Sequence, residues 1–80
     1  SLYPNPTNGF SILKIRSNYY ENIKIQIFNI LGEIVQSVDY NIIQGDNLIK
    51  LNLNEFNSGI YIIKIKSVNI NNQLKLIINK

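Results

Sequence analysis

The chain has 80 residues, 45% of them hydrophobic, and a formal net charge of +3. It contains no Cys and no His, which excludes disulfides, thiolate metal ligands and nucleophilic sites that depend on a His base. One small domain spanning residues 1–80 is expected, with enough apolar material for a single core. Its apolar runs are too short for membrane insertion, and its eight basic residues are dispersed rather than gathered into a nucleic-acid-binding patch.

The opening residues predict an extended, non-helical entry into the domain. Pro4 and Pro6 fix their own backbone angles and push the residues before them away from the helical region. Asn8 and Gly9 form a turn signal before the first strand, since both tolerate backbone angles that most residues avoid. No charged and apolar leader follows Ser1, so an export signal is expected upstream of it.

The first strand has an ambiguous phase. Phe10 and Ile12 share one face of an extended chain, whereas Leu13 and Ile15 share the opposite face. A β-bulge that switches the phase between the two pairs is therefore expected here.

Period-two alternation predicts four later strands. Apolar residues alternate with polar ones, which places one set on a core face and the other toward water. The core-facing sets are Ile23, Ile25 and Ile27; Ile49, Leu51 and Leu53; Tyr61, Ile63 and Ile65; and Leu74, Leu76 and Ile78. Turn signals at residues 45–47, 57–59 and 69–72 separate these segments. Six short strands predict an all-β, antiparallel sandwich or barrel.

Residues 27–38 fit two patterns. Their apolar positions match a helical stripe, but Gly32 and several β-branched residues disfavour a helix interior. Asn29 and Gly32 suit the first and fourth positions of a type I turn. We therefore expect a hairpin that joins residues 23–28 to residues 33–40.

Few residues suggest chemistry. The five acidic side chains show no spacing that predicts a catalytic pair, so neither an enzyme nor a cofactor is expected. Asp46 and Asn47 could ligate calcium, but the spacing of a calcium loop is absent and an ordinary turn is preferred. The five tyrosines could stack on bases or sugars, although core or loop packing is the favoured interpretation.

Some apolar residues point the wrong way for a single core. If Tyr61 faces the core, then Ile60 and Ile62 face outward, and Ile77 raises the same question in the last strand. Either a neighbouring strand or loop covers them, or they form an exposed apolar stripe for a partner.

Four motifs occur together in a telling order. They are Tyr3-Pro4-Asn5-Pro6-Thr7-x-Gly9, Ile27-Phe28-Asn29-x-x-Gly32-x-x-Val35, Phe56-x-x-Gly59-x-Tyr61, and a basic, apolar last strand at residues 75–80. In this order and spacing the chain resembles the C-terminal sorting domain of the type IX (Por) secretion system of Bacteroidetes-type bacteria.

The resemblance implies a small immunoglobulin-like antiparallel β-sandwich of about six to seven strands. It also implies a noncatalytic signal at the end of a larger cargo, which is exported to the periplasm and then to the cell surface or medium. The implied partners are the type IX translocon, an outer-membrane shuttle protein and a sortase-like protease that removes the domain.

The last strand is the prime candidate for receptor contact, because its edge could pair with a partner. The candidate contact residues are Gly59, Ile60, Tyr61, Leu74, Lys75, Leu76, Ile77, Ile78 and Lys80. The candidate turn-forming residues are Pro4, Pro6, Gly9, Asn29 and Gly32. In the alternative, Gly32, Gly59 and Tyr61 only shape the fold.

Two other functions stay open at this stage. One is a structural or adhesive surface module that binds glycans or proteins, and the other is an oligonucleotide-binding barrel. A monomer is expected, with pairing through exposed strand edges as a further possibility.

Overall fold

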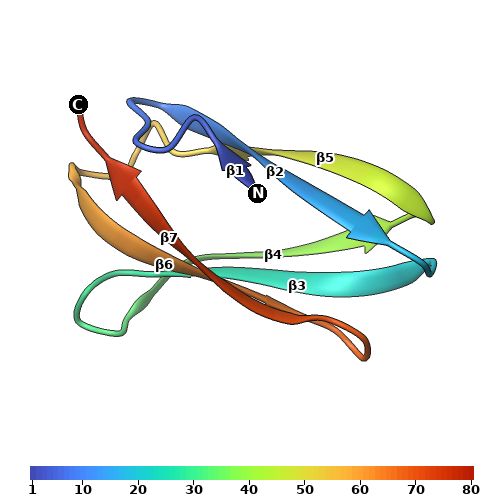
Figure 1. The fold of residues 1–80 in the computed structure, drawn as a ribbon. Helices are drawn as coiled ribbons and strands as arrows, with labels where there is room; N and C mark the ends of the chain where they lie inside the picture. Colours follow the sequence, from blue (N-terminus) through green and yellow to red (C-terminus); the bar gives the residue numbers. More distant parts are fainter.

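The computed structural model describes residues 1–80 and contains two antiparallel sheets that pack face to face as a β-sandwich (Figure 1). The strands are β1 (Leu2–Tyr3), β2 (Phe10–Ser17), β3 (Glu21–Phe28), β4 (Ile34–Ile42), β5 (Gly45–Asn52), β6 (Gly59–Lys66) and β7 (Asn71–Ile78). One sheet has the order β1-β2-β5 and the other β4-β3-β6-β7. The expected all-β sandwich of six to seven strands is confirmed. The structure has no helix that could cross a membrane.

The core lies between the two sheets and follows the period-two pattern of the sequence. It contains 14 buried residues: Leu13, Ile15, Ile23, Ile25, Ile27, Ile42, Ile49, Leu51, Leu53, Tyr61, Ile63, Ile65, Leu76 and Ile78. The core-facing sets predicted from alternation are all among them except Leu74, which is half-buried against the same cluster. Ile side chains dominate because branched residues pack well on pleated surfaces.

The expected bulge in β2 is wrong. The strand is regular from end to end, and its inward residues are Ser11, Leu13, Ile15 and Ser17. Phe10 and Ile12 simply face outward. The two buried serines are tolerated because each finds a carbonyl: Ser11 Oγ donates to Pro4 O at 2.7 Å, and Ser17 Oγ donates to Tyr19 O at 2.9 Å.

The hairpin between β3 and β4 is confirmed, and the helical alternative is wrong. Gly32 N–H donates to Asn29 O at 3.0 Å and closes the turn, with Gly32 at φ 84°. Asn29 Oδ1 accepts from the backbone N–H groups of Leu31 and Glu33, both at 3.0 Å. A bulge between Ile27 and Phe28 lies just before this turn.

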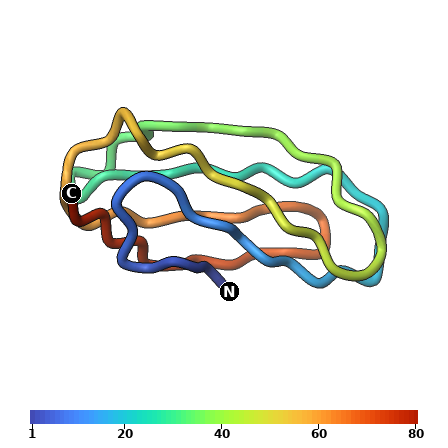
Figure 2. Tube along the Cα trace, turned by 90° about the horizontal axis from the view of Figure 1, so that it is seen from above, coloured from blue at the N-terminus to red at the C-terminus, as the bar shows by residue number.

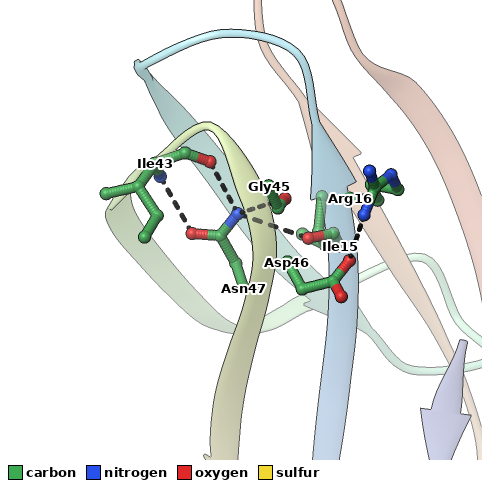
Figure 3. A network of polar contacts seen from close by, with 6 residues as sticks. All are labelled: Ile15, Arg16, Ile43, Gly45, Asp46 and Asn47. Carbon is green, nitrogen blue, oxygen red and sulfur yellow. Dashed lines mark hydrogen bonds and ion pairs between the residues drawn. The ribbon is translucent and has the colours of Figure 1, made fainter.

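The turn expected at residues 45–47 is misplaced, because these residues already belong to β5. The connection from β4 is shorter and is held by the buried Asn47 side chain (Figure 3). Its Oδ1 accepts from Ile43 N–H at 2.9 Å, and its Nδ2 donates to Ile43 O at 2.9 Å. The same Nδ2 approaches Ile15 O and Gly45 O at 3.3 Å. Asn47 thus fixes the point where the chain crosses between sheets.

Candidate functional site

The opening motif is bound along the outer edge of the last strand. Asn5 Oδ1 accepts from Ile77 N–H at 2.9 Å, and Asn5 Nδ2 donates to Lys75 O at 2.7 Å. Thr7 N–H donates to Ile77 O at 2.9 Å, and Thr7 O accepts from Asn79 N–H at 2.8 Å. Residues 5–7, which we call the clasp, therefore run parallel to the end of β7. Figures 1 and 2 show the N-terminal loop beside the end of β7.

The rest of the opening motif holds the clasp in place. Thr7 is buried, and its hydroxyl accepts from the N–H groups of Gly9 and Phe10 while donating to Phe10 O. Gly9 O accepts from Leu53 N–H at 2.9 Å. A Cβ on Gly9 would lie 2.7 Å from Asn54 Oδ1, so this glycine permits a close approach. The clasp does not follow from the local sequence pattern, and its one signal is the polar Asn5 between Pro4 and Pro6.

The clasp limits the strand edge that is open for pairing. In an antiparallel strand, alternate residues point their N–H and C=O groups to the same side. The outward groups of Ile77 and the Lys75 carbonyl are taken by Asn5 and Thr7. The outward groups of Asn71 and Gln73 and the Lys75 N–H stay free of the clasp, so the open part of the β7 edge lies toward the start of the strand.

The candidate contact residues divide between the two faces of the four-stranded sheet. Tyr61, Leu76 and Ile78 are buried in the core and are not on the surface of the folded domain, whereas Leu74 is half-buried at the edge of the same core. Tyr61 OH donates to Asn57 O at 2.8 Å, and its ring packs 5.5 Å from that of Phe56.

Three other candidates, Ile60, Lys75 and Ile77, gather on the outer face. Ile60 lies directly opposite Ile77, and Ile62 lies opposite Lys75 on the neighbouring strand. On the other side of β6, Phe28 of β3 lies directly opposite Ile62. We call Phe28, Ile60, Ile62, Lys75 and Ile77 together the outer patch. Ile60 is 46% exposed, and Phe28, Ile62 and Ile77 are half-buried. The outward orientation of Ile60 and Ile62, derived from alternation, is confirmed.

Positive charge lies along one side of the outer patch. Lys64 Nζ lies 4.8 Å from the centre of the Phe28 ring, in the geometry of a cation–π contact. Lys24 and Lys66 form an adjacent cross-strand pair, with Asp39 opposite Lys24 on β4. The outer face thus combines apolar side chains with an excess of lysines, which suits an acidic protein surface with an apolar centre.

Two further candidates lie at the end of the sandwich. Gly59 starts β6 opposite Ile78. Lys80 N–H donates to Ser58 Oγ at 2.9 Å, and Lys80 Nζ donates to Asn54 O. The last residue is therefore held against the connection between β5 and β6.

Other polar groups serve the fold. Asp46 pairs with Arg16 at 3.1 Å on the surface, and no group of three His, Cys, Asp or Glu side chains comes together. Hydrogen bonding from Ser67, the largest cause, and from Asn69 lowers the pKa of Glu21 against an opposing desolvation. Asn69 Nδ2 donates to Glu21 Oε2 at 3.3 Å, whereas Glu21 Oε1 is buried without a hydrogen-bond partner.

A shallow hollow lies on the three-stranded sheet. Its walls are Asn8, Gly9, Phe10, Lys50, Asn52 and Asn54. Lys50 Nζ lies 4.9 Å above the Phe10 ring, so the cation covers the aromatic face that a sugar would stack against. The tyrosines are spread over the molecule, with Tyr3, Tyr40 and Tyr61 on three different strands and Tyr19 and Tyr20 on the connection between β2 and β3.

The fold defines the chain as a small antiparallel β-sandwich domain. The family model for the secretion system C-terminal sorting domain matches residues 1–79, so the chain belongs to that family. It is a sorting domain of the type IX secretion system, which exports proteins across the outer membrane. Comparisons with curated proteins and with solved structures give no match.

Proposed function

We propose that the domain directs an attached cargo through the type IX translocon as a folded signal. An outer-membrane shuttle protein recognises it, and a sortase-like protease then removes it from the cargo. The cargo passes through the periplasm and reaches the cell surface or the medium. The domain itself performs no catalysis in this scheme.

We further propose that the outer patch is the surface that the translocation machinery contacts. The observation that supports this is the meeting of Ile60, Ile77 and Lys75 on one exposed face. Clustered apolar residues on a small domain mark an interaction site, and the neighbouring lysines favour an acidic partner.

Recognition through side chains of the outer face, rather than through backbone pairing, also fits the occupied edge of β7. Because the clasp occupies the edge at Lys75 and Ile77, a partner cannot add a strand there without displacing residues 5–7. The outer face is open without any such rearrangement.

A paired surface substitution tests this proposal. The double variant Ile60→Glu with Lys75→Glu replaces an apolar and a positive side chain of the outer patch by two negative ones, and it changes no core residue. The matched control is Leu48→Glu with Lys50→Glu on the outer face of the other sheet, where Leu48 is 65% exposed. Export of a reporter joined to residues 1–80 is expected to fall for the first pair only, with both variants folded by circular dichroism. Equal export of the two pairs would contradict the outer patch as the contact surface.

Deletion of residues 73–80 is a less specific test. It removes Leu76 and Ile78 from the core, so loss of export would follow from unfolding alone. The surface pair separates recognition from stability.

The hollow lined by Asn8, Asn52 and Asn54 supports a second candidate function, glycan binding by an adhesive module, because side-chain amides bind sugar hydroxyls. This function requires the domain to stay on the mature surface protein. Mass spectrometry of the exported protein distinguishes the two candidates, since a sorting signal is lost and an adhesive module is kept.

A further inference from the structure

The three-stranded sheet has an incomplete edge. Strand β1 pairs with β2 through Leu2 opposite Leu13 and Tyr3 opposite Ile12. The ladder continues one step further, because Lys14 N–H donates to Ser1 O at 2.9 Å and the backbone nitrogen of Ser1 donates to Lys14 O at 3.1 Å. β2 itself runs on to Ser17, so its last three residues extend past Ser1.

The backbone of Arg16 is directed toward this open edge. Lys14 turns both its N–H and its C=O toward Ser1, and the antiparallel alternation gives Arg16 the same direction. No residue of the chain stands opposite Arg16 on that side in the register of β1.

A groove with an apolar floor and a polar rim lies beside the same edge. It has a volume of about 150 Å³, several times that of one water molecule. Its lining combines polar residues, Ser1, Lys14, Arg16 and Asn72, with apolar residues from both sheets and from the β6–β7 connection, Leu13, Ile15, Ile65, Ile70 and Leu74. Ile70 and Leu74 remain half-buried, so the core is not fully covered there.

We propose that the cargo polypeptide enters the domain as a strand that continues β1 along β2 to Ser17. This rests on the proposed function, in which cargo is joined ahead of Ser1. The ladder register places the residue directly before Ser1 opposite Ile15, the second opposite Arg16 and the third opposite Ser17.

The alternation of side chains fixes what this strand must contain. Leu2 packs against the core, whereas Ser1 and Tyr3 are more exposed and face outward. The residue directly before Ser1 therefore points inward, into the groove between Ile15 and Leu74, and must be apolar. The second residue before Ser1 points to solvent and accepts a polar side chain. The junction between cargo and domain is thus an ordered strand rather than a free linker.

Amide hydrogen exchange tests the proposal in the purified fusion of a reporter to residues 1–80. Three fusions carry Val, Gly or Asp directly before Ser1, and a matched pair carries Val or Asp at the second position. Exchange of the Arg16 amide is expected to be roughly tenfold slower with Val than with Gly at the first position, because the added strand then pairs with β2. The Asp fusion should lose this protection, while the matched pair should be indistinguishable. The Gly fusion keeps the comparison valid if Asp prevents folding.

Equal exchange rates of the Arg16 amide in all fusions would overturn the proposed strand. An equal effect of Val at the first and second positions before Ser1 would also overturn it. The exchange measurement needs no export. Normal Arg16 protection without export therefore counts against the sorting function, whereas normal export without protection counts against the strand.

Discussion

The Asn5 side chain accepts a hydrogen bond from Ile77 N–H at 2.9 Å, although the two residues lie 72 positions apart. The same side chain donates to Lys75 O, so one amide satisfies both a donor and an acceptor of the β7 edge. The opening motif is therefore part of the last strand's structure, and the two ends of the domain depend on each other.

Loss of the Asn5 amide should weaken this link. Asn5→Ala removes two hydrogen bonds and is expected to lower the free energy of unfolding by about 1–2 kcal/mol. Urea denaturation measures the change, and the Ile77 amide should exchange faster. Asn8→Ala, in the exposed turn that follows, is the control and should stay within about 0.5 kcal/mol of the parent domain. Equal midpoints for Asn5→Ala and the parent would show that the clasp contributes nothing.

Gly32 is needed for the backbone of the hairpin turn. Its φ of 84° lies in the left-handed region, where a Cβ is strained even though no atom lies within 4 Å. Gly32→Ala is expected to cost about 1 kcal/mol, and Gly32→Asn should cost less because Asn tolerates this region. Thermal unfolding ranks the three proteins. A role in the fold alone also predicts normal export of both variants at temperatures where they stay folded.

Asn47 should be the most sensitive polar residue in the domain. Asn47→Leu leaves Ile43 N–H and nearby carbonyls without their partner, at a cost of about 2–4 kcal/mol. The surface residue Asn41, whose side chain bonds only that of Asn22, provides the control variant Asn41→Ala. Similar denaturation midpoints for the two variants would be incompatible with the bonding drawn in Figure 3.

The Glu21 carboxylate predicts a pH dependence at acid pH. Its pKa in the folded domain lies below the ordinary value of 4.5, chiefly through Ser67, so the folded state favours the ionised form. Its contribution to stability is present above pH 4.5 and is lost as the pH falls through the folded pKa. Glu21→Gln should therefore flatten the decline in unfolding free energy on acidification, and Ser67→Ala should act in the same direction. Parallel curves for Glu21→Gln and the parent would refute this.

Alternation identified the faces of β3, β5, β6 and β7 because the apolar period of two survives along each of them. It misassigned β2 because Ser11 and Ser17 occupy core positions, while Phe10 and Ile12 lie outside. Small serines that bond to nearby carbonyls break the hydrophobic pattern without breaking the strand.

Contacts between distant residues account for the rest of what the sequence analysis missed. The clasp joins Asn5 to Ile77, and no local pattern encodes such a pair. Likewise, Asn47 was interpreted as a turn residue because its local preference is for turns, whereas burial against Ile43 decides its place. The outer patch was predictable in part. Alternation in the sequence gave the outward direction of Ile60, but only the strand register of the structure shows that Ile77 is its neighbour.

The most direct test of the central claim is export of a periplasm-directed fluorescent reporter joined to residues 1–80. It is measured in a bacterium with a working type IX system and in a strain that lacks the translocon. Reporter at the surface or in the medium of the first strain only, with the domain removed, is the result that we predict. Reporter confined to the periplasm of both strains would contradict the assignment of this domain as a sorting signal.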